Sequence, residues 1–249
     1  MADRKKVRID LLLVERGLVP SREKAQALIM AGAVLVEDRP AEKAGEQFFT
    51  DVAVRLRGEL PRFVGRGGDK IDPAFTHFQI ALQGVTALDV GASTGGFTDC
   101  MLQRGAERVY AVDVGYNQLD QKLRQDPRVV VMERTHAKDL TPERFVPLPS
   151  FFTMDVSFIS VRKVLPFVLP CLLPGAMGLV LVKPQFELEP EYVEKGGVVR
   201  DEQHQRLAVE LVLEFIAREG HSSAGVFASP LRGEKAGNQE YFVQLGVAR

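Results

Sequence analysis

The sequence predicts an α/β protein in which a doubly wound, largely parallel sheet follows a small N-terminal α+β domain. Three observations predict this fold. Apolar runs alternate with helix-length segments beyond about residue 68, a glycine-rich turn follows the first of these runs, and the first 60 residues carry a separate pattern of two helices and short strands. With 249 residues, 45% of them hydrophobic, the chain can build a core in each domain.

In the N-terminal domain, an apolar-rich helix is expected over residues 8–16, and Gly17 ends it. A second helix is expected from Ser21 to about residue 31, because the Ser21 side chain can accept a hydrogen bond from the first helical turn. Residues 33–36 and 52–56 are rich in β-branched and apolar side chains, which predicts short strands.

The glycines and charges of residues 61–70 suit a linker or an ordered loop, and the domain boundary is expected near residues 60–68. We therefore expect domains 1–64 and 65–249, with the linker reaching about residue 68. Six apolar runs are the expected strands of the large sheet: 87–90, 109–112, 129–131, 151–154, 179–182 and 241–245. Ligands of such sheets bind at the carboxyl ends of the strands.

The charge is unevenly distributed along the chain. The formal net charge is −1, which argues against coating nucleic acid by bulk charge. The first 68 residues, however, contain 13 basic and 10 acidic residues, whereas the remainder contains 19 and 23. A basic N-terminal domain fits local contact with nucleic acid, and an ordinary solvated face explains the same charges equally well.

Several classes of protein do not fit the sequence. Cys100 and Cys171 are too few and too far apart for a disulfide framework or a zinc site, so we expect no metal and a reducing cytoplasm. Charges within residues 8–16 interrupt any apolar core of a signal peptide. Residues 164–182 are uncharged and long enough to span a bilayer, but three prolines and Gly175 predict a helix, a turn and a buried strand there.

A glycine-rich turn, residues 89–97, follows the first strand of the second domain. Asp89 and the small residues after it can hold the amino-acid part of a nucleoside cofactor. Asp113 lies 24 residues later and can accept hydrogen bonds from ribose hydroxyls, or it can cap a helix. Together these features fit S-adenosylmethionine as well as NAD, although the glycine spacing disfavours nicotinamide and flavin cofactors and the Walker lysine of ATP sites is missing.

Four ionisable residues lie where apolar strands meet loops or in the linker: Lys70, Asp155, Lys183 and Glu240. If they converge, the carboxylates can orient a lysine ammonium, and desolvation can prepare a lysine to take a proton from a sugar hydroxyl. Ordinary ion pairs at strand ends are the alternative for each residue taken alone.

The chain as a whole resembles the TlyA family, in which an RNA-binding domain of the ribosomal-protein S-four type precedes a Rossmann-like methyltransferase domain similar to the FtsJ ribose methyltransferases. The resemblance is nearly end to end and rests on motifs in the family's order. The matching segments are 8–18, 21–26, 66–70, 89–97, 112–116, 155–160, 183–187, 195–201 and 237–241.

The resemblance implies transfer of a methyl group from S-adenosylmethionine to the ribose 2′-hydroxyl of a cytidine in ribosomal RNA. It assigns the catalytic set to Lys70, Asp155, Lys183 and Glu240. Lys183 would be the central base or hydroxyl-orienting group, held by Asp155 and Glu240, and Lys70 would help to position the ribose.

The resemblance also implies two binding sets. The cofactor would contact Asp89, Gly91, Ala92, Ser93, Thr94, Gly95, Gly96, Phe97, Asp113 and Asp155. The RNA would contact Lys5, Lys6, Arg8, Arg22, Lys24 and Arg66. His136 departs from the family pattern, which puts asparagine there, and this leaves the contacts to the adenine open.

The expected partners are ribosomal RNA or ribosomal subunits, in the cytoplasm and without stable membrane association. Two other functions stay open at this point. One is a haemolysin or other membrane-active protein, a label that the family has also carried. The other is a non-catalytic RNA-binding factor for ribosome assembly, which would bind RNA without binding S-adenosylmethionine.

Overall fold

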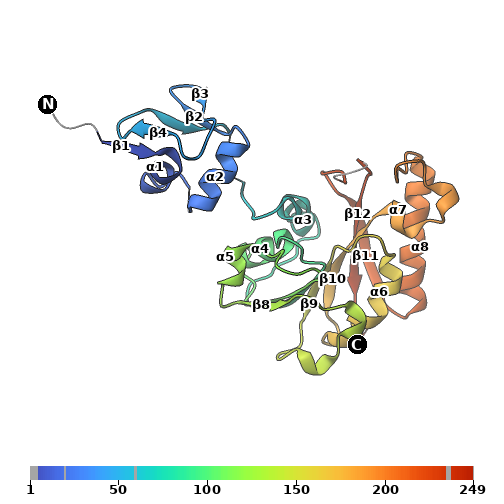
Figure 1. Cartoon of the computed structure of the whole chain (residues 1–249). Coiled ribbons are helices and arrows are strands. Elements are labelled where there is room, and N and C mark those ends of the chain that lie inside the picture. The colour runs from blue at the N-terminus through green and yellow to red at the C-terminus, as the bar shows by residue number, and fades with distance from the viewer. Residues whose placement is uncertain (1–4, 20, 59–60, 234–236, 249) are drawn as a thin grey trace. The chain divides into compact units, whose positions relative to one another are not determined.

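The computed structural model describes residues 5–19, 21–58, 61–233 and 237–248, and it separates into two compact units, Met1–Pro61 and Arg62–Arg249 (Figure 1). Each unit buries apolar side chains of its own. One cluster lies in the first unit, and two clusters lie on the two faces of the large sheet in the second.

The first unit packs two helices against short strands. Its elements are β1 (Lys6–Arg8), α1 (Ile9–Glu15), α2 (Arg22–Met30), β2 (Val34–Val36), β3 (Arg39–Pro40), β4 (Gln47–Phe49) and β5 (Val54–Leu56). The pairs form one two-stranded sheet, β1–β4, and one three-stranded sheet, β3–β2–β5. Ser21 accepts a hydrogen bond from the Lys24 amide at 3.3 Å, which confirms it as the cap of the second helix.

The second unit contains a seven-stranded sheet in the order β11–β12–β10–β9–β6–β7–β8. Its strands are β6 (Thr86–Val90), β7 (Arg108–Val112), β8 (Val129–Met132), β9 (Phe151–Met154), β10 (Met177–Val182), β11 (Ser222–Ala228) and β12 (Tyr241–Gly246). The neighbours from β10 to β8 are parallel, and β12 runs antiparallel to both β10 and β11. The predicted α/β sheet is confirmed, with β11 as an additional edge strand.

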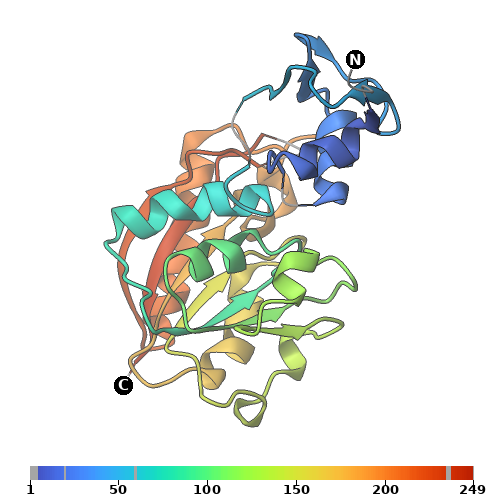
Figure 2. The same ribbon diagram turned by 90° about the vertical axis from the view of Figure 1, so that its left-hand side faces the viewer.

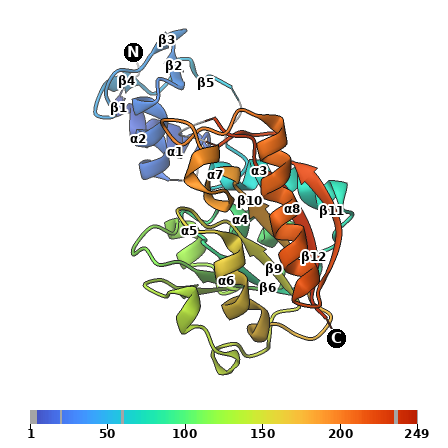
Figure 3. The same cartoon turned by 90° about the vertical axis from the view of Figure 1, so that its right-hand side faces the viewer.

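Helices cover both faces of this sheet (Figures 2 and 3). The helical elements are α3 (Arg66–His77), α4 (Gly96–Gln103), α5 (Gln121–Arg124), α6 (Val161–Val168), α7 (Pro184–Glu187), α8 (Glu202–Arg218) and four short 3-10 turns, η1 (Ala137–Asp139), η2 (Pro142–Arg144), η3 (Leu169–Cys171) and η4 (Pro190–Tyr192). Apolar residues of α6 and α8 pack on one face, whereas those of α3, α4 and α5 pack on the other. Consecutive strand residues alternate between the two clusters, as a doubly wound sheet requires.

The expectation of a linker or loop over residues 66–70 is wrong, because α3 begins at Arg66. The glycines of this segment serve close packing. A Cβ atom at Gly68 would lie 2.2 Å from the Phe63 ring, and one at Gly96 would lie 2.8 Å from the Gly68 amide nitrogen. The start of α3 therefore packs against the start of α4 at a distance that only glycines allow.

Residues 164–182 form the end of α6, a short turn and the buried strand β10, as expected. In the described ranges, no helix is both long enough and apolar enough to cross a bilayer.

Phe152, on the central strand β9, should be essential to the stability of the second unit. Its side chain is fully buried, and its ring covers Gly178 of β10, where a Cβ atom would lie 2.2 Å from a ring carbon. Phe152→Ala should lower the free energy of unfolding by about 3–5 kcal/mol, because it removes a fully buried ring and leaves a cavity in the core. Urea denaturation followed by circular dichroism measures this. Val130→Ala, on the half-exposed strand β8, is the control, and equal losses in both variants would contradict the prediction.

Candidate active site

A pocket of about 620 Å³ lies at the carboxyl ends of β6, β9 and β10. Its lining includes all four ionisable residues that the sequence singled out: Lys70, Asp155, Lys183 and Glu240. Small residues of the glycine-rich turn line another part of it, and Phe158 and Phe186 contribute aromatic rings. The volume lies within the range of cofactor and ligand sites, and acid–base groups meet apolar surface there.

The topology of the sheet explains why these residues meet. Asp155 directly follows β9, and Lys183 directly follows β10, its parallel neighbour. Glu240 directly precedes β12, but this strand is antiparallel to β10, and Tyr241 pairs with Val182. The beginning of β12 therefore lies beside the end of β10, and all three residues reach the same edge. Lys70 arrives from α3.

The four ionisable groups form two ion pairs. Lys70 Nζ lies 2.6 Å from Glu240 Oε2, and Lys183 Nζ lies 2.5 Å from Asp155 Oδ1. The second contact is an ion pair without the geometry of a hydrogen bond. The expectation that Glu240 holds Lys183 is not met, since the partner of Glu240 is Lys70. At most 22% of each side chain is exposed, so each charge depends on its partner.

Ser157 is a member of the site that the sequence analysis missed. Lys183 Nζ donates a hydrogen bond to Ser157 Oγ at 2.8 Å, and Ser157 lines the pocket. Its position two residues after Asp155, in a loop that directly follows a strand, was the available signal. The contacts of Lys183 thus come from one loop, which supplies both Asp155 and Ser157.

The glycine-rich turn has a backbone that only glycine adopts easily. Gly91 has φ +85°, and a Cβ atom there would lie 2.2 Å from the carbonyl oxygen of Asp155. Gly95 has φ +95°, and a Cβ atom there would meet the Leu123 side chain. Gly91, Ala92, Ser93, Thr94, Gly96 and Phe97 line the pocket. The turn therefore brings its backbone close to the loop that carries Asp155 and leaves space on the pocket side.

Asp113 braces this turn. Its two carboxylate oxygens accept hydrogen bonds from the backbone amides of Ser93, at 2.8 Å, and Gly115, at 2.6 Å. It does not cap a helix: the cap of the next helix, α5, is Asp120. Asp113 is half-buried, and its carboxylate oxygens can accept further hydrogen bonds beside these two.

Asp89 does not reach the pocket. Its side chain is fully buried, and its oxygens accept hydrogen bonds from the hydroxyls of Thr98 at 2.6 Å and Thr153 at 2.9 Å. Burial raises the pKa of Asp89 to about 6, against the opposing effect of the two threonine hydrogen bonds. These contacts correct the expectation of direct cofactor binding: Asp89 ties β6 to α4 and β9 behind the glycine-rich turn.

The expected RNA-binding residues of the first unit are organised around a buried carboxylate. Arg8, Arg22 and Gln26 donate hydrogen bonds to Asp10, whose side chain is fully buried. The Arg8 guanidinium, helped by Arg22 and Gln26, holds the pKa of Asp10 far below its usual range. Part of the charge of both arginines is therefore compensated inside the unit.

The remaining expected RNA contacts differ in their surroundings. Lys5 and Lys6 are exposed, with Lys6 Nζ 5.0 Å from the centre of the Phe49 ring, and Lys24 is half-buried. Arg66 belongs to the second unit, where it lines the pocket and donates to the Arg232 carbonyl at 3.3 Å. His136 is exposed and is not part of the pocket lining.

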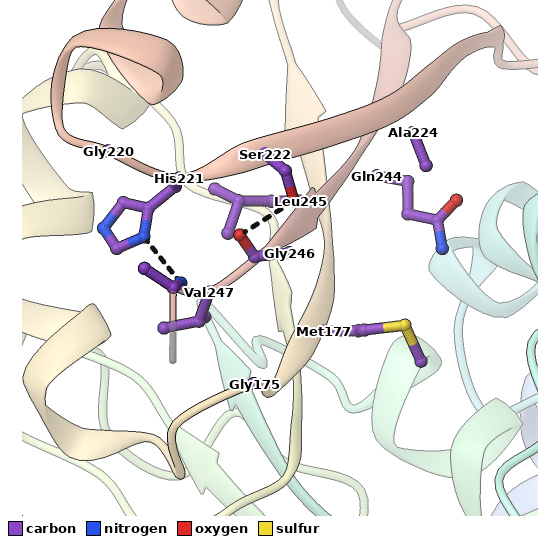
Figure 4. Close-up of a pocket in the computed structure, with 11 residues that line it drawn as sticks. Gly175, Met177, Gly220, His221, Ser222, Ala224, Gln244, Leu245, Gly246 and Val247 are labelled. Carbon is purple, nitrogen blue, oxygen red and sulfur yellow. Dashed lines mark hydrogen bonds between the residues drawn. The ribbon is translucent and has the colours of Figure 1, made fainter.

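A second cavity, of about 470 Å³, lies at the opposite end of β10 and β12 (Figure 4). Its lining is glycine, apolar and amide groups together with Ser222 and His221, and His221 Nδ1 accepts a hydrogen bond from the Ala248 amide. It lacks the paired acids and bases of the larger pocket. In the part of the chain that the structure describes, no group of three His, Cys, Asp or Glu side chains is placed to hold a metal ion.

Comparison with known proteins identifies two matching domains. The model of the FtsJ-like methyltransferases matches residues 63–247, and that of the S4 domain matches residues 7–48. The 16S/23S rRNA (cytidine-2′-O)-methyltransferase TlyA of Mycobacterium tuberculosis is 45% identical over 97% of this chain and 90% of its own. Hemolysin A of Brachyspira hyodysenteriae is 40% identical over 96% of this chain and 99% of its own.

Solved structures show the same fold. A Streptococcus thermophilus structure that carries a provisional hemolysin name has a TM-score of 0.75 and 40% identity, and it covers 99% of this chain and 90% of its own. An S-adenosylmethionine-dependent methyltransferase from Mesorhizobium loti has a TM-score of 0.51 at 14% identity, over 73% of this chain and all of its own, which supports the fold of the second unit alone.

Asp89 should make the stability of the second unit pH-dependent. An ordinary aspartate in the unfolded chain releases its proton near pH 3.8, whereas the raised pKa of Asp89 keeps it protonated to about pH 6 in the folded state. The stability that the folded state gains from holding this proton is fully present below pH 4 and is lost as the pH rises through 6. Asparagine does not titrate, so the Asp89→Asn variant does not lose stability in this way. The unfolding free energy of the variant minus that of wild type should therefore rise by up to about 3 kcal/mol from pH 4 to pH 7.

Urea denaturation at pH 4, 5, 6 and 7 measures this difference, with the exposed Asp139→Asn as the control for loss of a carboxylate. A difference between Asp89→Asn and wild type that stays constant over this pH range would show that Asp89 does not hold its proton in the folded state.

Proposed function

The chain belongs to the family of FtsJ-like methyltransferases, and we propose that it transfers a methyl group from S-adenosylmethionine to the 2′-hydroxyl of a cytidine in ribosomal RNA. The observation that carries this proposal is one pocket that unites a glycine-rich turn with two buried lysine–carboxylate pairs. The S4 domain model over residues 7–48 supports RNA as the substrate, and a ribosomal RNA substrate would put the activity in the cytoplasm.

The pocket fits S-adenosylmethionine. Gly91, Ala92, Ser93, Thr94 and Gly96 form a wall of small residues in the pocket, where the backbone of the turn is open to a ligand. When bound, S-adenosylmethionine supplies an electrophilic methyl group on a sulfonium. The turn would hold the methionine part, and Asp113 at the end of β7 would accept from the ribose. Asp89 would act from behind, by bracing β6 against α4.

Lys183 is the group that would act on the ribose hydroxyl. Its ammonium has three N–H donors. Ser157 accepts one of them, Asp155 faces the charge, and a remaining donor can hold the 2′-oxygen with a lone pair directed at the methyl group. Attack by the 2′-oxygen would form the new oxygen–carbon bond as the carbon–sulfur bond breaks, so that the cofactor would leave as S-adenosylhomocysteine. The hydroxyl proton would pass to the Asp155 carboxylate, because the Lys183 ammonium already holds three protons. Exclusion of water and fixed orientation would supply much of the rate.

The Lys70–Glu240 pair would act next to the reacting atoms. Lys70 reaches the pocket from α3. Its ammonium is held by an ion pair with Glu240, whose side chain is almost completely buried. An ammonium in this position can hold ribose or phosphate oxygens of the same nucleotide. The two pairs therefore have different roles, one for the attacking oxygen and one for the placement of the sugar.

The alternatives have weaker support. The lytic function rests on the names of relatives, and no contact in the pocket relates to it. An RNA-binding assembly factor without catalysis would not need the two buried pairs, which are costly to desolvate. The experiment on Lys183 separates both from the proposed function, since only a methyltransferase loses an activity in that variant.

Lys183→Met should abolish methyl transfer while cofactor binding stays intact. Removing the group that orients or deprotonates the hydroxyl should lower the rate about 10²- to 10⁴-fold. The affinity for S-adenosylmethionine should stay within about threefold, because the glycine-rich turn is untouched. The measurements are incorporation of tritiated methyl groups into unmodified ribosomal RNA and calorimetry with the cofactor. Lys138→Met, at an exposed site, is the control, and an active Lys183→Met variant would refute the mechanism.

The lysines of the first unit should carry the salt-dependent part of RNA binding. Lys5, Lys6 and Lys24 can be replaced by Gln without disturbing Asp10, whereas reversing the charge of Arg22 would place two carboxylates together. The triple variant should bind RNA more weakly, and its slope of log K against log salt should be shallower by about 2. Filter binding between 50 and 300 mM salt measures the slope. Lys43→Gln is a single-charge control in the same unit, and an unchanged slope in the triple variant would refute this RNA surface.

A further inference from the structure

We propose that Glu187, together with Ser160 and Arg162, positions Lys183 for methyl transfer without touching substrate or cofactor. The inference rests on the proposed function, because it assigns residues outside the pocket to the same reaction. None of the three residues lines the pocket, and none belongs to the catalytic or binding sets that the sequence predicts. We call the three residues the Glu187 clamp.

The clamp is a dense set of hydrogen bonds around one buried carboxylate. Glu187 is 4% exposed. Its Oε2 accepts from Ser160 Oγ at 2.5 Å and from Arg162 Nε at 3.1 Å, and its Oε1 accepts from the Val161 amide at 2.8 Å. Arg162 also donates to the Glu187 carbonyl at 2.7 Å. A carboxylate held by this many donors is fixed in place, and loss of the charge would leave buried donors without a partner.

The position of the clamp in the chain gives it a role beyond capping α6. Residues 155–160 connect β9 to α6 and carry Asp155 and Ser157, the two partners of Lys183. Residues 183–187 follow β10 and carry Lys183 itself. The clamp joins the far ends of these two segments, Ser160 and Glu187, while pairing of β9 with β10 joins their near ends.

Between these ends, three further contacts cross from one segment to the other. Lys183 meets Asp155 and Ser157, and the rings of Phe158 and Phe186 lie 5.3 Å apart. The two segments therefore form a closed ring of contacts around the catalytic lysine. Phe158 has φ +64°, a strained conformation for a bulky residue. A segment under such strain relaxes unless both of its ends are held.

The physical consequence concerns the lysine side chain. Lysine has a flexible four-carbon stem, so its ammonium is placed by what it contacts at the end of that stem. Both contacts of Lys183 lie on the segment whose far end is Ser160. If the clamp opens, Asp155 and Ser157 can move relative to β10, and the ammonium moves with them. A displacement of about 1 Å at the reacting atoms is enough to cost about 100-fold in rate.

The test compares Glu187→Gln with a matched variant, Asp126→Asn. Asp126 is a half-buried carboxylate that also accepts from an arginine, Arg128, at Nε and from a backbone amide, but it precedes β8 at the opposite end of the sheet from the pocket. Each change keeps the shape of the side chain and removes one charge beside one arginine. Single-turnover methyl transfer to ribosomal RNA is measured with saturating full-length protein, alongside calorimetric affinities for S-adenosylmethionine and RNA.

We expect Glu187→Gln to slow the single-turnover rate 10- to 100-fold with both affinities within threefold of wild type, and Asp126→Asn to keep the wild-type rate. Arg162→Gln, which spares the bonds of Glu187 to Ser160 and Val161, should slow the rate three- to tenfold. It decides the question if Glu187→Gln does not fold.

A rate within twofold of wild type in a folded clamp variant would overturn the inference, and so would a loss of cofactor affinity as large as the loss of rate, since the clamp would then support the cofactor site. If the wild-type protein transfers no methyl group to ribosomal RNA, the proposed function fails and the inference fails with it. Normal transfer by wild type and clamp variants alike overturns the inference alone.

Discussion

The second unit is arranged around a single constraint: four charged side chains are removed from water in one pocket and must be paired. A buried lysine or carboxylate without a partner costs several kcal/mol, so Lys70 needs Glu240 and Lys183 needs Asp155. Asp155 and Lys183 directly follow the neighbouring strands β9 and β10. Glu240 directly precedes β12, and the antiparallel direction of β12 brings it to the edge where β9 and β10 end. The sheet order is thus the means by which charges distant in sequence find one another.

Close backbone approach is the second requirement of the pocket, and it explains the glycines better than turn formation does. Gly68 and Gly96 let α3 and α4 begin side by side, which delivers Lys70 next to the glycine-rich turn. Gly91 lets the same turn pass the carbonyl of Asp155. The glycine-rich turn and the loop that carries Asp155 are therefore one packed structure, and a side chain added at either place would move both.

Much of this could be predicted from the sequence, because apolar runs and residues next to them report on strands and strand ends. Six strands of the large sheet and the four pocket residues were visible in this way. The edge strand β11 was not, since residues 222–228 are mostly exposed and contain Gly225 at a bulge. The pairing of the charged side chains could not be predicted, because residue spacing does not encode side-chain directions. The sequence did not show which lysine pairs with Glu240. It also did not show that Asp89 faces Thr98 and Thr153 instead of the pocket.

In both units a buried carboxylate accepts hydrogen bonds from arginine side chains, and this changes how the charge of the chain should be interpreted. In the first unit, Asp10 holds Arg8 and Arg22, so the number of basic residues in that unit overstates the free cationic groups that it could offer to RNA. The arginines gain fixed orientation in return, with donors left over for phosphate or ribose oxygens. In the second unit, Glu187 binds Arg162 and joins the two segments around Lys183. In each unit an acid removed from solvent therefore fixes the direction of a cation.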